Sequence, residues 1–266
     1  MKLQYIGLSV IALIGVSGVA SADFGTNTLS TFADNANGGD GLPIADQTLG
    51  SGITAQFRSG GIVAPTSGTR FLNAQNTGSS FDSWAAIRWD LSDLYAAINA
   101  EVAGKPGATG AVIKSVELGL YQSPFSASSQ STFGIHYIED DSTDFDPQNV
   151  AGQFGAFGGP TIDFSFFTGG NSFVTTGFFD NVGPVGARDA FDIGSSDVIA
   201  DLNDFSDNFL TLALQAASGN ASYGGSSPFG ERFSPELKVT YNIIPTPGAA
   251  ALFGLAGLVG LRRRRA

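Results

Sequence analysis

The chain has 266 residues with 24 acidic and 13 basic side chains, and its formal net charge is −11. All 24 acidic residues lie between positions 23 and 244, whereas five of the 13 basic residues lie outside that range. Because a surface this acidic repels nucleic acid, we expect no nucleic-acid partner. The chain has no cysteine and only one histidine, which excludes disulfides and a zinc site built from His and Cys ligands.

The glycine and phenylalanine contents favour a fold built of strands. The sequence holds 36 glycines and 22 phenylalanines. Glycine weakens helices, whereas aromatic residues are enriched in strands. Residues 23–244 are enough to bury one core without disulfides. We therefore predict one all-β domain over residues 23–244.

The first 22 residues are typical of a secretory signal peptide. Lys2 precedes the apolar run IGLSVIALIGVSGVA, and Ala20-Ser21-Ala22 follows it. Ala20 and Ala22 place small side chains at the two positions that signal cleavage requires, and the apolar run is short for a membrane span. We predict that residues 1–22 direct export and are removed.

The segment WAAIRWDL, residues 84–91, alternates with a period of two and predicts a half-buried strand. We expect Arg88 and Asp90 on its outer face. The inward set that the alternation predicts is Ala85, Ile87, Trp89 and Leu91.

Trp84 is separated from Trp89 by an odd number of residues, so the two indoles lie on opposite faces of that strand. An exposed indole can stack on a sugar ring, which makes Trp84 the candidate ligand-stacking residue of the chain. The alternative is that both tryptophans belong to the core or its edge.

The next segment, SDLYAAINAEV, predicts the one helical stretch of the domain. Leu94, Ala97 and Ile98 recur at helical spacing, and Ser92 or Asp93 can cap the first turn. Gly104 and Pro106 follow its end. We expect this helix to lie across one end of a sandwich of strands.

The strand expected at residues 114–122, KSVELGLYQ, turns Val116, Leu118 and Leu120 inward and Glu117 outward. The chain's one histidine, His136, follows in the strand-like segment FGIHYIED, where we expect a structural role. A serine triad would need His136, and no Gly-x-Ser-x-Gly motif is present. Two carboxylates suffice for a glycosidase, but no pair among the five glutamates stands out. We therefore expect no enzymatic activity.

An acidic segment, EDDSTDFD, follows His136. Hard cations such as calcium bind several loop carboxylates, so calcium is the one cofactor that we consider. The segment lacks the spacing of an EF-hand loop, and a merely solvated acidic turn is the alternative. The candidate calcium ligands are Asp140, Asp141, Asp144 and Asp146.

Residues 151–186 mix phenylalanine with glycine at no fixed period, and we predict short strands and long loops there. Two further alternating strands, 208–216 and 236–243, close the domain. Strands separated by Gly, Ser, Asn and Pro clusters favour an antiparallel β-sandwich over a parallel sheet. The inward residues predicted in these last two strands are Leu210, Leu212, Leu214, Leu237, Val239, Tyr241 and Ile243.

The series of strands resembles the DNRLRE-type domains of bacterial surface proteins over residues 50–243. The resemblance rests on an Arg-hydrophobic-Asp-Leu strand at Arg88 to Leu91, a Leu-x-Leu-Tyr ending at Leu118 to Tyr121, and a Pro-x-Leu-x-Val-x-Tyr strand at Pro235 to Tyr241. It implies a jelly-roll-like β-sandwich, similar to carbohydrate-binding modules, that binds or adheres and is not an enzyme.

The chain ends in a short apolar segment and an arginine cluster. Residues 248–261 would form about 21 Å of helix, shorter than the ~30 Å of a bilayer core, and residues 243–247 nearly close the gap. Under the positive-inside rule the arginines stay cytoplasmic, so the tail would hold the chain in the inner membrane while the domain crosses. The arginines are Arg262, Arg263, Arg264 and Arg265.

The tail, residues 245–266, resembles the PEP-CTERM sorting signal. Pro245 and Pro247 enclose Thr246, where that family most often has glutamate, and a Gly/Ala/Leu segment and the arginines follow. The resemblance implies recognition and cleavage by an exosortase during transfer to the cell surface or extracellular matrix. A permanent single-span anchor without cleavage is the alternative.

Together these features predict three segments: a signal peptide at 1–22, a β-sandwich domain at 23–244 and a sorting or anchor segment at 245–266. We expect an exported, non-enzymatic structural or adhesive protein of the cell surface or extracellular matrix. The alternative is a carbohydrate-binding module that recognises extracellular polysaccharide.

Overall fold

The computed structural model describes residues 24–33, 51–58, 61–63, 71–123, 128–139, 159–167, 169–225 and 234–246. Three of the predicted features lie outside these residues: the signal peptide at 1–22, the tail from Pro247 onward, and the candidate calcium site. The calcium ligands concerned are Asp140, Asp141, Asp144 and Asp146.

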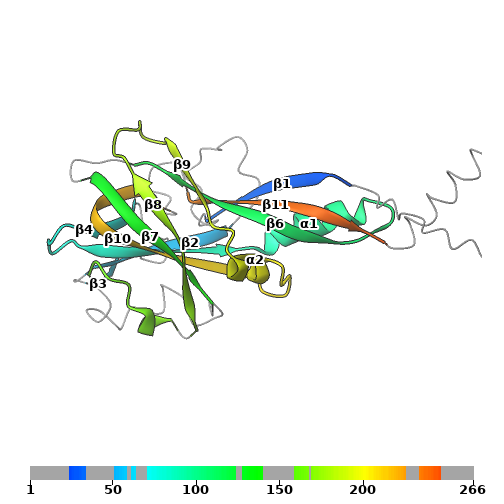
Figure 1. Ribbon diagram of the computed structural model, residues 1–266, viewed down its shortest axis with the longest axis horizontal. Helices are drawn as coiled ribbons and strands as arrows, with labels where there is room; N and C mark the ends of the chain where they lie inside the picture. Colours follow the sequence, from blue (N-terminus) through cyan, green and yellow to red (C-terminus); the bar gives the residue numbers. More distant parts are fainter. Residues whose placement is uncertain are drawn as a thin grey trace, which may run out of the picture.

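Two antiparallel sheets form the domain (Figure 1), which confirms the prediction of an all-β sandwich. The smaller sheet has the strand order β1 (Thr26–Phe32), β11 (Glu236–Pro245), β6 (Ala108–Tyr121) and β9 (Arg188–Asp192). The larger sheet has the order β3 (Gly61–Val63), β2 (Ser51–Arg58), β5 (Ser83–Asp90), β4 (Phe71–Asn76), β10 (Phe209–Gly224), β7 (Ser129–Ile138) and β8 (Asn171–Phe179).

Strand β10 is the centre of the larger sheet. Its first half pairs with β5, its second half pairs with β4, and its other edge pairs with β7. Gly219, in the second half, has a φ of +76° and leaves room for the carbonyl of Gln130 on β7, which a Cβ at Gly219 would approach to 2.0 Å. A glycine is therefore required where β10 passes β7.

The main core lies between the two sheets and contains every residue that the alternation pattern turned inward. Trp89 is fully buried in it, and its indole Nε1 donates a hydrogen bond to the carbonyl of Pro235 at 3.3 Å. Fully burying a side chain such as leucine stabilises the folded state by about 1.5–3 kcal/mol, and this shared core therefore holds the two sheets together.

A second, smaller core covers the outer face of the larger sheet. Phe57 from β2 and Trp84 from β5 meet Ile162 and Phe167, which belong to the segment 159–167 that lies over this face. The expectation that this face of β5 is open to solvent was wrong. Even Arg88 is only 8% exposed, with its guanidinium carbon 3.9 Å from the centre of the Phe209 ring.

The predicted helix is present as α1 (Ser92–Ala103), with Leu94, Tyr95 and Ile98 buried. It packs against β6 and β1 at one end of the sandwich (Figure 1). The expectation that Ser92 or Asp93 caps its first turn was wrong, because neither side chain makes a capping hydrogen bond. Instead the carboxylate of Asp90 accepts a hydrogen bond from the Ser92 N–H at 2.9 Å.

A second helix, α2 (Ser196–Leu202), was not predicted, so the expectation of one helical insert was incomplete. The Ser195 hydroxyl caps it by accepting from the Val198 N–H, and Val198 and Leu202 are buried at a spacing of four residues. Asn203 then ties α2 to β6, because its amide exchanges two hydrogen bonds with the backbone of Ile113, at 2.8 and 3.1 Å.

The described part of the Phe/Gly-rich region contains loops, as predicted, but its one strand, β8, has nine residues and is longer than the short strands that were expected. A 3₁₀ turn at Phe164–Phe166 precedes β8, and a loop joins β8 to β9. Phe167 and Phe179 are buried, whereas Phe173 and Phe178 are exposed.

Within the described ranges, the helices are too short or too polar to cross a membrane.

Candidate functional site on the polar face of the smaller sheet

The outward residues of the smaller sheet form a continuous polar face. On β11 the alternation that buries Leu237 and Val239 turns Glu236 and Lys238 outward. The register aligns Lys238 with Ser30 of β1 on one side and with Glu117 of β6 on the other. All four strands thus contribute side chains to one surface, although they are far apart in the sequence.

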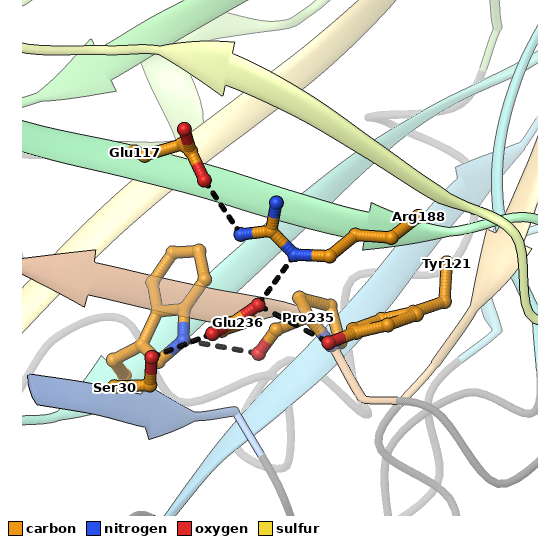
Figure 2. Close-up of polar contacts among 7 residues, drawn as sticks. Ser30, Glu117, Tyr121, Arg188, Pro235 and Glu236 are labelled. Atoms are coloured by element: carbon orange, nitrogen blue, oxygen red, sulfur yellow. Dashed lines mark hydrogen bonds and ion pairs between the residues drawn. The ribbon is translucent and has the colours of Figure 1, made fainter.

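Arg188, the first residue of the edge strand β9, is the central residue of a polar network on this face (Figure 2). Its Nη2 donates to Glu117 Oε1 at 2.7 Å, and its Nε donates to Glu236 Oε2 at 2.6 Å. Glu236 also accepts from the Ser30 hydroxyl at 2.6 Å and from the Tyr121 hydroxyl at 3.1 Å. One guanidinium and one carboxylate therefore connect all four strands.

Gly119 makes this arrangement possible. It lies opposite Glu236 in the pairing of β6 with β11. A Cβ at this position would be 2.7 Å from Arg188 Nε and 2.8 Å from Glu236 Oε2. Because these distances are far shorter than normal contacts, any other residue at position 119 would force the ion pair to shift from its present position.

The environment of the ion pair keeps Glu236 and Arg188 ionised. Burial opposes the charge of Glu236, but the hydrogen bonds from Ser30 and Arg188 and the adjacent guanidinium outweigh it and hold the pKa of Glu236 below its ordinary value. Burial likewise opposes the charge of Arg188, yet its two carboxylate partners raise the pKa of Arg188 further. Burial and the Glu236 charge raise the pKa of Tyr121.

An open depression of about 280 Å³ lies beside this ion pair on the same face. Glu117 is shared between the two features, and the remaining side chains supply an ammonium group, a second carboxylate and two hydroxyls. These groups can donate and accept hydrogen bonds to a hydroxyl-rich molecule. The lining residues are Ser115, Val116, Glu117, Asp192, Lys238 and Thr240.

A second polar cluster joins the two sheets at the end of β6. The Gln122 amide Nε2 donates to Asp180 Oδ1 at 3.0 Å and to both oxygens of Asp189, at 3.0 and 2.9 Å. Tyr223 of β10 donates its hydroxyl to Asp189 Oδ2 at 3.0 Å. Burial outweighs these hydrogen bonds and raises the pKa of Asp189. The cluster fixes the loop between β8 and β9 to both sheets.

Trp84 is not the exposed platform that a sugar-stacking role requires, and that prediction was wrong. Its side chain is fully buried, and its ring stacks on Phe57 with ring centres 3.7 Å apart. Phe167 contacts it with ring centres 5.9 Å apart. The indole does lie on the face opposite Trp89, as expected, but the segment 159–167 covers that face.

His136 has the packed position expected of a structural residue. Its ring lies between those of Phe164 and Phe173, with centres 5.4 and 5.5 Å away. Burial lowers the pKa of His136, so the imidazole is neutral at pH 7. In the part of the chain that the structure describes, no group of three or more His, Asp or Glu side chains is arranged to hold a metal ion.

The start of the predicted sorting segment belongs to the sandwich. Pro245 is the last residue of β11, and Thr246 donates its N–H and its hydroxyl to the carbonyl of Gly107, at 2.6 and 2.9 Å. Ile243 is only 4% exposed in the core. The idea that residues 243–247 lengthen a membrane span was therefore wrong for the folded domain, because β11 uses most of them. Pro247 and the four arginines lie outside the described residues.

The sequence pattern did not predict the ion pair of Arg188 with Glu117 and Glu236. Glu117 was expected on the outer face of its strand and no pair of glutamates stood out, and the one local signal was Gly119 inside a strand. No model of a known protein family matches this chain, and no curated protein shows significant similarity to it.

Proposed function

We propose that this protein is an exported, non-enzymatic component of the cell surface or extracellular matrix, with a structural or adhesive role. The observation that carries the proposal is the ion-pair network in which Arg188 donates hydrogen bonds to both Glu117 and Glu236. In this arrangement the four strands of the smaller sheet are connected through ionised groups that are already hydrogen-bonded to one another. Such a network supports a rigid scaffold.

The same geometry argues against glycoside hydrolysis at this pair of glutamates. A glycosidase needs one carboxylic acid whose pKa is raised so that it can protonate the leaving group. The pKa of Glu236 is lowered, since Arg188 and Ser30 stabilise its anion. Arg188 also occupies the space between the two carboxylates, where the scissile bond would have to lie.

The proposed fold is a jelly-roll-like sandwich of the DNRLRE type. Its support is the position of the motifs that carry the resemblance. Arg88 to Leu91 spans the end of β5 and the residue after it, Leu118 to Tyr121 ends β6, and Pro235 to Tyr241 spans the residue before β11 and its first half. Each motif therefore lies on, or directly borders, a strand that contributes to the main core.

The proposed route to the surface rests on the two ends of the sequence. Residues 1–22 direct export, and the PEP-CTERM-like tail holds the chain briefly in the inner membrane until an exosortase-type enzyme cleaves it. The test is the intact mass and cell fraction of the native protein. A mass lacking both ends, in the surface or medium fraction, supports the proposal. If the protein is found in the inner membrane with its C-terminus intact, the tail is a permanent anchor and the proposal of cleavage is wrong.

A second candidate function, binding of extracellular polysaccharide, is favoured by the depression on the smaller sheet. Its Lys238 ammonium, Asp192 carboxylate and hydroxyl groups fit the hydrogen-bonding needs of a sugar. A glycan array tests it, with Lys238→Ala as the variant and Lys105→Ala, on the remote helix side, as the matched control. Saturable binding that Lys238→Ala weakens and Lys105→Ala does not would support this function. If no glycan on the array binds, the structural role remains the proposal.

A further inference from the structure

Strand β8 is the outermost strand of the larger sheet, next to β7 (Figure 1). Its pairing with β7 uses one edge of its backbone. Among the described residues no strand pairs with its other edge. Free N–H and C=O groups along such an edge are a template for a further strand, and native proteins usually protect them with charged side chains or proline.

β8 has none of these protective features. Its sequence, NSFVTTGFF, contains no charged residue and no proline. The neighbouring β7, SQSTFGIHYI, carries no Asp, Glu, Lys or Arg either. Because burial lowers the pKa of His136, the whole β7–β8 ribbon is uncharged at pH 7. In a chain with a net charge of −11, this is a neutral surface on an acidic molecule.

The exposed apolar side chains of the described residues gather at the same place. Six large apolar side chains are strongly exposed, and four of them lie between positions 173 and 185, on β8 and the loop that follows it. Phe173 is 59% exposed and Phe178 is 55% exposed. The four side chains are Phe173, Phe178, Val182 and Val185.

A bulge places the two phenylalanines on one face. Phe173 pairs with His136 and Phe178 pairs with Thr132, and the register shifts by one residue between Ile135 and His136. Without this shift their odd spacing would put them on opposite faces. Both rings therefore extend the outer face of the sheet at its open edge.

The other sheet edges differ from β8. β9 carries Arg188, Asp189 and Asp192, and β3 has only three residues. β1 is uncharged, but none of its side chains is among the strongly exposed large hydrophobic residues. Among the sheet edges that the structure describes, β8 alone combines length, neutrality and exposed aromatic side chains.

We propose that two copies of this chain associate through β8, by antiparallel pairing of β8 with its twofold-related equivalent. The charge distribution selects a second copy as the occupant. Two molecules with the same negative charge repel each other over most of their surfaces, and they approach with least repulsion where both are neutral. Antiparallel pairing also brings the Phe173 end of one strand to the Phe178 end of the other, and aromatic cross-strand pairs are favourable.

This assembly joins the two larger sheets into one continuous sheet and forms a closed, isologous dimer. It does not depend on where the protein is located in the cell, so it can fail or succeed independently of the proposed function. Higher salt should strengthen the dimer, because salt screens the repulsion between the two acidic molecules.

Sedimentation velocity of the full chain at pH 7, over a range of concentrations, tests the inference. We expect a reversible dimer, which Phe178→Lys weakens by at least about tenfold, because each new ammonium group would take the place of the aromatic ring that faces Phe173 of the other copy and would lie in an apolar contact. Phe81→Lys is the matched control. Phe81 is 62% exposed in the turn between β4 and β5, and its replacement should leave the dimer unchanged. Phe173→Lys serves as the second variant if Phe178→Lys does not fold.

Hydrogen exchange supplies a second readout that does not depend on a variant. Backbone amides of residues 171–179 should exchange more slowly as the protein concentration rises, while those of β9 should not change. A monomer at all concentrations would overturn the inference. So would a dimer that Phe178→Lys and Phe81→Lys affect equally, or one that leaves exchange in β8 unchanged.

Discussion

Replacing Arg188 with methionine tests whether the polar face of the smaller sheet is held by its ion pair. Methionine keeps much of the length and apolar surface of the arginine side chain but removes the charge and all of the donors. Glu236, whose side chain is only 10% exposed, then loses its counter-ion. Glu117 loses the same partner but is 38% exposed, so water can replace it.

The expected cost follows from these exposures. Breaking a fully buried ion pair costs about 3–5 kcal/mol, whereas an exposed pair contributes about 0–1 kcal/mol. Glu236 keeps its hydrogen bonds from Ser30 and Tyr121, and the Arg188 side chain is 28% exposed, so the site is less than fully buried. We expect Arg188→Met to lower the free energy of unfolding by about 2–3 kcal/mol at pH 7.

Urea unfolding measures this difference, and its pH dependence identifies the cause. Because the folded-state pKa of Glu236 is lowered, the stability that its anion contributes is present above its ordinary value of 4.5. That stability is lost as pH falls through the folded-state pKa. The gap between wild type and Arg188→Met should therefore narrow below pH 4.5, and the double variant Arg188→Met with Glu236→Gln should recover part of the loss. A gap of less than about 0.5 kcal/mol at pH 7, or an equal gap at pH 7 and pH 3, would refute the reasoning.

Three further predictions concern packing and protonation. Gly177→Ala should destabilise the protein by about 1–3 kcal/mol in thermal unfolding, because its Cβ would be 2.4 Å from the buried Phe133 ring, whereas Gly110→Ala, with nothing within 4 Å, should be close to neutral. Trp84→Ala should cost about 3–5 kcal/mol in urea unfolding, since it empties the smaller core, and a near-neutral result would contradict the burial of this side chain. Burial lowers the pKa of His136 in the folded state, so the unfolded chain binds a proton at this histidine at a higher pH than the folded chain does. Wild-type stability should therefore fall as pH drops below about 6.5. His136→Phe should remove that part of the pH dependence, and identical curves for the two proteins would contradict it.

The inward faces of the strands were predictable because alternation is a local property. In β5, β6, β10 and β11 every residue of the predicted inward sets is in the main core. The helix α1 was also predictable, because twelve residues give three turns of helical spacing before Gly104. The seven residues of α2 give less than two full turns, and its pattern of Val198 and Leu202 is too short to stand out from the surrounding strands.

What covers a strand face is a property of distant segments, and this is where the sequence pattern failed. Alternation correctly placed Trp84 opposite Trp89, but burial of Trp84 depends on Phe57 and on Phe167, which lies more than eighty residues away in the chain. The Arg188 ion pair has the same origin. The two partners of Arg188 come from two other strands, and only the sheet register brings them within hydrogen-bond distance.

The pairing of β1 with β11 determines when the domain can complete its fold. Among the described residues, Thr26–Phe32 pairs only with Glu236–Pro245, the last described strand, and closing so long a loop is entropically costly and slow. A chain made or threaded from its N-terminus therefore carries β1 without a partner strand until its final segment emerges. The smaller sheet is then completed last, so a chain cut before residue 236 would leave β1 without its partner strand and β6 paired with β9 alone.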